Sequence, residues 1–257
     1  DEIMKYNKTL NKLNNYAIPR LYLIITICTV IGYVFKYTFT DFYNNLLLIP
    51  PAVVLNHQYW RLFTWIFTVP YDFSGWSIIF LPINLFFYYF IGMRLEQYWG
   101  RFMYNLYVLG GMLLTNIAVV ITAVFRYIVS SGAASNLAKD IASGDIAEAA
   151  TSVTRYMLMS IFLAFTVIGG DNMVYLYFVI PLKMKWLGYI DLVLLLISFI
   201  SGGVFTKVVV VVSVVNYFIY YFINSLNEFF FSYFFLIKEF NNEINKSCIF
   251  IFIFILF

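Results

Sequence analysis

Long apolar runs constrain the fold of this chain more than any other feature of its sequence. Five windows have the length and hydropathy of membrane-spanning helices, and they cover residues 21–40, 76–93, 102–125, 186–205 and 206–224. A helix needs about 20 residues to cross the roughly 30 Å hydrocarbon core of a bilayer. The runs are continuous rather than alternating with a period of two, so they do not fit the strands of a membrane β-barrel. The sequence therefore predicts an all-α polytopic membrane protein.

A sixth and shorter apolar window covers residues 156–169. It ends in the polar group Gly169-Gly170-Asp171-Asn172, which is typical of a helix end, so we expect a short fourth span here. Composition agrees with a membrane protein, because 63% of the residues are hydrophobic, only 11% are charged, and the mean hydropathy is +0.84. Membrane lipid is the first expected partner. The formal net charge of +3 gives no reason to expect a nucleic acid.

The placement of lysine and arginine predicts the orientation of the spans. Basic residues gather in three segments that alternate along the chain, as cytoplasmic segments do: Lys5, Lys8, Lys12, Arg20, Arg94, Arg101, Lys183 and Lys185. We therefore expect a cytoplasmic N-terminal arm over residues 1–20, a transmembrane domain over 21–224, and a C-terminal tail over 225–257, to which we assign no function. Both termini are expected in the cytoplasm.

The first two long loops have opposite character. Residues 42–75 include LLLIPPAVVL and YWRLFTWIF, which are too apolar for a solvated connection. We expect this loop to lie in the membrane interface, with Trp60 at headgroup depth and Arg61 either snorkelling or bonded within the protein. Residues 129–152 are rich in serine, alanine and glycine, so we expect a water-exposed segment between the third and fourth spans, either a loop or a short amphipathic helix.

A series of motifs between residues 58 and 100 carries a resemblance to a known family. The pair Trp60-Arg61 stands in the first loop, Asn84 lies eight residues before Gly92 in the second span, and Glu96 and Gly100 close that span. In order and spacing, these motifs resemble those of the rhomboid superfamily of intramembrane proteases and, more distantly, its derlin-type relatives. The resemblance covers about residues 18–224. Its scaffold motif comprises Trp60, Arg61, Asn84, Gly92, Glu96 and Gly100.

This resemblance implies a six-transmembrane rhomboid-like helical bundle with a membrane-embedded first loop. It also implies a multi-pass protein of the bacterial inner (plasma) membrane, since prokaryotic rhomboid relatives are the most similar. Near the turn of the second span, Arg94, Glu96 and Arg101 are expected to form one charged network. Asp191 is expected to pair with Lys185 at the start of the fifth span.

The catalytic part of the family pattern is absent. A rhomboid protease uses a serine in a Gly-x-Ser-Gly element on the fourth span and a histidine on the sixth. No Gly-x-Ser-Gly occurs here, and the sixth span carries Asn216, which cannot act as a general base near neutral pH. Ser160 in the fourth span and His57 in the first loop form the alternative dyad that the chain could offer. We expect no catalytic residue and a structural role for both.

No cofactor or metal is expected. The cysteines Cys28 and Cys248 lie in different parts of the predicted topology and in no metal-ligand spacing.

Three functional hypotheses follow. The first is a catalytically inactive rhomboid-like protein that binds or guides other transmembrane proteins, with a short fourth span and an embedded loop that thin the bilayer. The second is a divergent intramembrane serine protease. The third is a small transporter or channel, for which the spans offer only Asn84, Asn116 and Asn216 at mid-depth.

Overall fold

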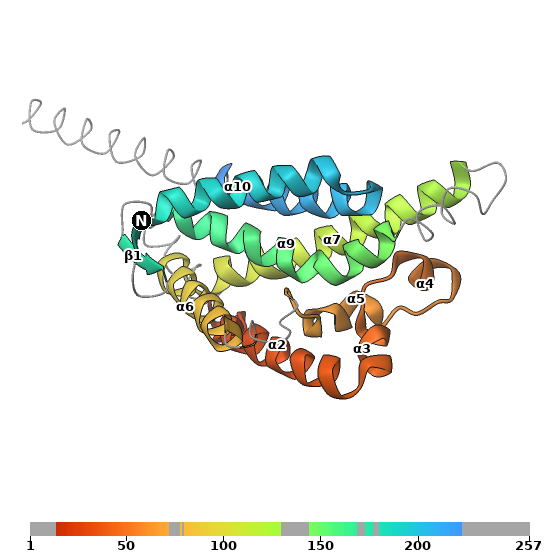
Figure 1. Cartoon of the computed structure of the whole chain (residues 1–257), viewed down its shortest axis with the longest axis horizontal. Coiled ribbons are helices and arrows are strands. Elements are labelled where there is room, and N and C mark those ends of the chain that lie inside the picture. The colour runs from red at the N-terminus through yellow and green to blue at the C-terminus, as the bar shows by residue number, and fades with distance from the viewer. Residues whose placement is uncertain are drawn as a thin grey trace, which may run out of the picture. The chain divides into compact units, whose positions relative to one another are not determined.

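The computed structural model describes residues 14–71, 78, 80–129, 144–168, 173–176 and 180–222. Its long helices are α2 (Leu21–Thr38), α6 (Phe80–Trp99), α7 (Arg101–Val129), α9 (Asp145–Ile168), α10 (Met184–Ser201) and a last helix, Val204–Phe222. The first loop folds into four short helices, α3 (Thr40–Leu46), α4 (Pro50–Leu55), α5 (Arg61–Thr64) and η1 (Trp65–Phe67). Between α9 and α10, the short strands β1 (Met173–Leu176) and β2 (Ile180–Lys183) pair antiparallel. Figure 1 shows this arrangement.

The described part of the chain confirms the prediction of a helical, polytopic membrane protein. Five helices are long and apolar enough to cross a bilayer: Asn14–Thr38, Arg101–Ile128, Asp145–Val167, Met184–Ser201 and Val204–Phe222. The predicted second span, 76–93, overlaps α6, which is 20 residues long. This helix is not among the five, and it contains the polar residues Asn84, Arg94 and Glu96. The count of six spans stays a prediction.

The fourth long helix differs from the sequence-based expectation. We predicted a short span at 156–169 after an exposed segment over 129–152, but α9 already begins at Asp145 and is 24 residues long, about 36 Å. Its first turns bury one face, formed by Ile146, Ala149, Ala150 and Val153. These four positions have helical spacing. The alanine-rich segment packs as an amphipathic helix that is continuous with the span.

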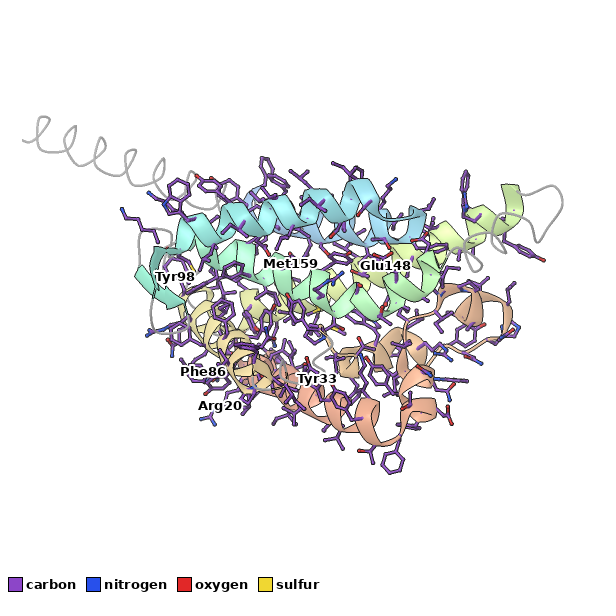
Figure 2. The ribbon with its side chains drawn as sticks, in the orientation of Figure 1. Arg20, Tyr33, Phe86, Tyr98, Glu148 and Met159 are labelled. Carbon is purple, nitrogen blue, oxygen red and sulfur yellow. The ribbon has the colours of Figure 1, made fainter. Side chains whose placement is uncertain are left out.

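The helix α9 is the central element of the bundle. In its membrane-length window 72% of the residues are buried, against 22–33% in the other four candidate spans. It packs against α6, α7, α10 and η1, and it lies between them in Figure 1. The other helices leave large apolar side chains exposed, such as Ile121 on α7 and Ile197 on α10. Figure 2 shows the side chains on the ribbon, with Phe86 of α6 among those labelled. Those faces suit a lipid environment.

A buried carboxylate links the start of α9 to the start of the last helix. Asp145 accepts hydrogen bonds from the backbone N–H of Phe205 (2.8 Å), from that of Thr206 (3.2 Å) and from the Thr206 hydroxyl (3.1 Å). The free N–H groups of a helix start favour a negative partner. Gly203 permits the approach, since a Cβ there would lie 2.2 Å from Asp145 Cγ.

Candidate functional site

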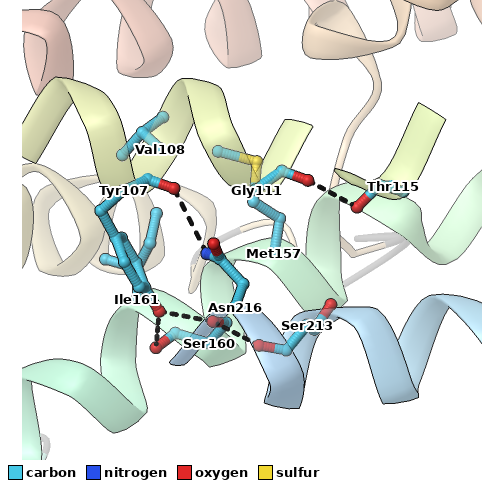
Figure 3. A pocket seen from close by; sticks show the side chains of 9 residues that line it. All are labelled: Tyr107, Val108, Gly111, Thr115, Met157, Ser160, Ile161, Ser213 and Asn216. Atoms are coloured by element: carbon cyan, nitrogen blue, oxygen red, sulfur yellow. Dashed lines mark hydrogen bonds between the residues drawn. The ribbon is translucent and has the colours of Figure 1, made fainter. Parts of the chain in front are cut away.

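Ser160 and Asn216 line one pocket between three helices. Ser160 comes from α9, Tyr107 and Gly111 from α7, and Ser213 and Asn216 from the last helix. The cavity is small, with a volume of about 10 Å³, which is about the space that one water molecule needs. Figure 3 shows its lining: Tyr107, Val108, Gly111, Thr115, Met157, Ser160, Ile161, Ser213 and Asn216. The structure thus brings Ser160 of α9 and Asn216 of the last helix into one pocket.

Hydrogen bonds within the chain occupy the Ser160 hydroxyl. Its Oγ donates to the carbonyl oxygen of Ser213 at 2.9 Å. The Tyr107 hydroxyl lies 2.5 Å from the same Oγ and 2.9 Å from the Ser160 carbonyl oxygen, which accepts from it. Ser160 is 3% exposed. A serine whose proton points at a backbone carbonyl has no partner that could take that proton, so this arrangement does not activate it as a nucleophile.

Asn216 closes the other side of the pocket. Its Nδ2 donates to the carbonyl oxygen of Tyr107 at 3.3 Å. The side chain lies directly against Gly111, where a Cβ would be 2.7 Å from Asn216 Nδ2. Glycine at this position therefore allows α7 and the last helix to approach, and the asparagine holds them by an interhelical hydrogen bond.

The alternative dyad is not assembled among the described residues. His57 is exposed in the first loop, at a backbone φ of 53°, and its Nδ1 lies 2.8 Å from the hydroxyl oxygen of Tyr59. Ser160 is buried in α9 and bonds Tyr107 and Ser213 instead. Each side chain has a local structural partner.

Arg61 organises the first loop. It is 5% exposed and donates to four neutral oxygen atoms: the carbonyl oxygens of Asn44 and Leu47 and the side-chain oxygens of Asn45 and Gln58. Burial lowers the pKa of its guanidinium, and the planar fork of donors suits this many acceptors at once. The neighbouring Trp60 is 52% exposed. The arginine is therefore bonded within the protein, whereas the tryptophan faces outward.

A second asparagine, Asn116 on α7, attaches this loop to the bundle. Its Oδ1 accepts from Trp65 Nε1 at 3.0 Å, and its Nδ2 donates to the Leu62 carbonyl oxygen at 2.8 Å. From the sequence we had considered this residue only as a polar group at mid-depth of a possible transport path. An asparagine in an apolar helix needs partners, but the sequence does not say that they lie 51 and 54 residues away.

Two further scaffold positions lie on α6. Gly92 is buried, and a Cβ there would lie 2.5 Å from Tyr22 Cβ and 2.8 Å from the Tyr104 hydroxyl. Glycine at this position of α6 therefore allows both α2 and α7 to pack closely against α6. Asn84 is half-buried, and no hydrogen bond of its side chain is present among the described residues.

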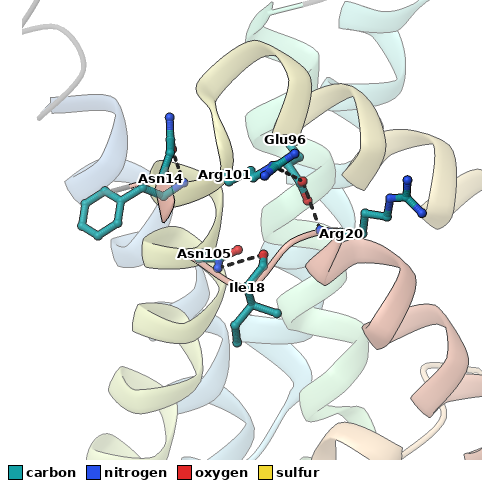
Figure 4. A network of polar contacts seen from close by, with 7 residues as sticks. Asn14, Ile18, Arg20, Glu96, Arg101 and Asn105 are labelled. Atoms are coloured by element: carbon teal, nitrogen blue, oxygen red, sulfur yellow. Dashed lines mark hydrogen bonds and ion pairs between the residues drawn. The ribbon is translucent and has the colours of Figure 1, made fainter. Parts of the chain in front are cut away.

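Glu96 and Gly100 lie in a polar network at the turn between α6 and α7, which Figure 4 shows. Glu96 Oε1 accepts from the backbone N–H of Arg20 at 3.2 Å and lies 4.0 Å from Arg101 Nε. Asn14 Oδ1 accepts from the Phe102 N–H at 2.9 Å, and Asn105 Nδ2 donates to the Ile18 carbonyl oxygen at 3.1 Å. Gly100 has a φ of 82°, a conformation that glycine adopts without strain.

The charged network differs from the sequence-based expectation in two ways. Arg94 does not join Glu96, and its guanidinium lies 5.1 Å from the centre of the Phe90 ring. The N-terminal segment takes its place, through Asn14, Ile18 and Arg20. The predicted pair of Asp191 with Lys185 is also wrong, because Asp191 is buried on the inner face of α10 and its Oδ2 has no hydrogen-bond partner in the described structure.

Among the described residues, no group of three or more histidine, cysteine, aspartate or glutamate side chains could hold a metal ion. Comparisons with family models, with curated proteins and with solved structures find no match to this chain.

Proposed function

We propose that this chain is a rhomboid-like membrane protein without protease activity, which binds or guides other membrane proteins within the bilayer. One observation carries the inactive part of the proposal. The Ser160 hydroxyl donates a hydrogen bond to the Ser213 carbonyl oxygen, and the described residues that line this pocket include no histidine, carboxylate or lysine.

The scaffold part rests on the motifs and on where they lie. Trp60 and Arg61 belong to a loop of short helices, Gly92 lies where three helices meet, and Glu96 and Gly100 form a tight turn between two long helices. Ser160 and Asn216 share a pocket although 56 positions separate them in the sequence. We extend the proposal to six spans, cytoplasmic termini and a bacterial inner membrane, on the distribution of basic residues and the rhomboid resemblance.

The binding part rests on the first loop. Its helices are too short to cross a bilayer, yet Phe42 and Phe63 are exposed on them, and Trp60 is exposed directly before α5. An apolar element of this length is expected to sit in one leaflet and to thin the bilayer beside it. Local thinning lowers the cost of polar residues in the transmembrane helix of a neighbouring protein. The length of α9 removes the second contribution that a short fourth span would have made.

Labelling with a fluorophosphonate probe tests the inactive part. The purified full-length protein should remain unlabelled, as should Ser160→Ala, because the serine lacks a base. Labelling of the wild-type protein that disappears in Ser160→Ala would establish the divergent protease instead.

Photo-crosslinking tests the binding part. A photoreactive amino acid placed at Phe63, which is 71% exposed on the first loop, should give discrete adducts with integral membrane proteins in native membranes. The same group at Ile200 on α10, which is 75% exposed, is the matched lipid-facing control. Equal patterns from both positions would mean random collision and would contradict a binding role for the loop.

A further inference from the structure

Two buried acceptor atoms in the network of Figure 4 have no partner among the described residues. They are Glu96 Oε2 and Asn105 Oδ1, on residues that are 9% and 6% exposed. Buried polar atoms are nearly always bonded, and an unpaired acceptor is costly, above all on a charged group. Both atoms can only accept, so the missing partner is a hydrogen-bond donor.

The network lies where helices begin and end. Glu96 is in the last turn of α6, and Asn105 is in the second turn of α7. Their partners Ile18 and Arg20 lie directly before α2. Two of these helices are candidate spans, so their ends lie at headgroup depth. Exposed Tyr16 and Tyr98 nearby in the sequence fit that depth.

Positive charge lies outside the buried acceptors. The Arg101 side chain is 59% exposed, with Nε 4.0 Å from Glu96 Oε1. Arg20 is also exposed, although its backbone N–H bonds Glu96. The site therefore has buried hydrogen-bond acceptors and exposed guanidinium groups. A zwitterionic headgroup would match this arrangement if its amine faced the buried acceptors and its phosphate faced the guanidinium groups.

We propose that this network binds the headgroup of a phospholipid with a primary amine, of which phosphatidylethanolamine is the simplest. The ammonium group donates to the free oxygens of Glu96 and Asn105, and the phosphate pairs with Arg101. A primary ammonium has three donors, whereas the trimethylated ammonium of phosphatidylcholine has none. An anionic headgroup without an amine would bring its charge toward Glu96 and leave both acceptors unpaired.

The test compares these two lipids, which share the phosphate and the net charge. The full-length protein, delipidated in detergent, is incubated with equal amounts of phosphatidylethanolamine and phosphatidylcholine of the same acyl chains, and retained lipid is counted by native mass spectrometry. A preference of about tenfold or more for the amine lipid is expected from one or two charge-assisted hydrogen bonds. Equal retention would show that water alone satisfies the two acceptors and would overturn the proposal.

Variants locate the preference. Glu96→Gln keeps an oxygen for the Arg20 N–H but replaces the free charged acceptor by an amide donor, so the preference should fall well below the wild-type value, and the neutral Asn105 Oδ1 should retain only a small part of it. Arg101→Gln should lower the retention of both lipids and leave their ratio unchanged. Arg94→Gln is the matched control, because Arg94 lies on α6 like Glu96 but outside the network, and it should behave as the wild type. A full preference in Glu96→Gln would overturn the assignment to this site, and the wild-type comparison decides the proposal even if that variant does not fold.

Discussion

The Ser160 pocket and the Glu96 network are both polar and buried, but they differ in whether their hydrogen bonds are complete. Among the described residues that line the pocket, no fully buried side-chain oxygen or nitrogen atom lacks a partner, whereas the Glu96 network leaves two acceptors open. A closed set of hydrogen bonds fixes neighbouring helices and has nothing to offer a ligand. Acceptors without a partner in the chain can instead bind a hydrogen-bond donor of a ligand. The pocket that resembles an active site is therefore the structural one.

The largest effect on stability is expected from substitution of Arg61, whose guanidinium donates hydrogen bonds to four oxygen atoms of the first loop. Arg61→Ala leaves four oxygens without their donor and should lower the free energy of unfolding by about 3 kcal/mol. Arg61→Lys retains the charge without the fork of donors and should fall between this variant and the wild type. Thermal unfolding in detergent measures both, with Arg94→Ala as the exposed control. Similar midpoints for Arg61→Ala and Arg94→Ala would contradict the closed loop network.

The next effect concerns the contact that closes the pocket. Gly111→Ala puts a Cβ 2.7 Å from Asn216 Nδ2, so the asparagine must move and lose its bond to Tyr107. We expect a loss of about 1–2 kcal/mol, measured by the same unfolding assay. Gly110→Ala is a close control, since nothing lies within 4 Å of a Cβ there, and it should be neutral or slightly stabilising. Equal unfolding midpoints for Gly111→Ala and Gly110→Ala would contradict a close contact between Gly111 and Asn216.

Ser160→Ala tests the pocket itself. It removes the hydroxyl that bonds Tyr107 and Ser213, so the protein should lose about 1 kcal/mol of stability and no enzymatic function. Unfolding and probe labelling are measured on the same preparation. A stable variant that loses a cleavage product would assign a catalytic role to this serine.

The smallest effect is expected in the open network. In lipid-free detergent, Glu96→Gln keeps the bond to Arg20 and removes a buried charge whose second oxygen is unpaired. Its stability should change by less than about 0.5 kcal/mol, because the lost ion pair with the exposed Arg101 contributes little. A loss of stability as large as that of Arg61→Ala would show that the hydrogen bonds of Glu96 are as complete as those of Arg61.

Most of the long helices could be predicted from the sequence. The windows 21–40, 102–125, 186–205 and 206–224 each overlap one observed helix, with ends that shift by a few residues. Continuous apolar runs carry this information by themselves, because the bilayer sets the length that a helix needs. The start of α9 could not be found in this way. The composition of residues 142–150 is typical of a loop or of a short separate amphipathic helix, and hydropathy does not show that this helix is continuous with the span.

The partners within the sites were harder to predict. Ser160 and His57 could be judged unlikely as a dyad from the sequence, but the tyrosine and backbone carbonyl that bond Ser160 come from helices 53 residues away in either direction. The same holds for Asn116 and for Asn14, whose partners depend on how the helices pack. Hydropathy and motif spacing give the depth of a polar residue, and only the tertiary structure gives its neighbour.

The carboxylate of Asp145 sets an order for the assembly of this membrane domain. Its three hydrogen bonds all go to residues 205 and 206, so they cannot form until the ribosome has made the start of the last helix. Until then α9 carries a charge that it cannot bury, and its first turns must stay near water. A chain that stops before residue 204 lacks all three donors, so its Asp145 has only water to bond at the start of α9.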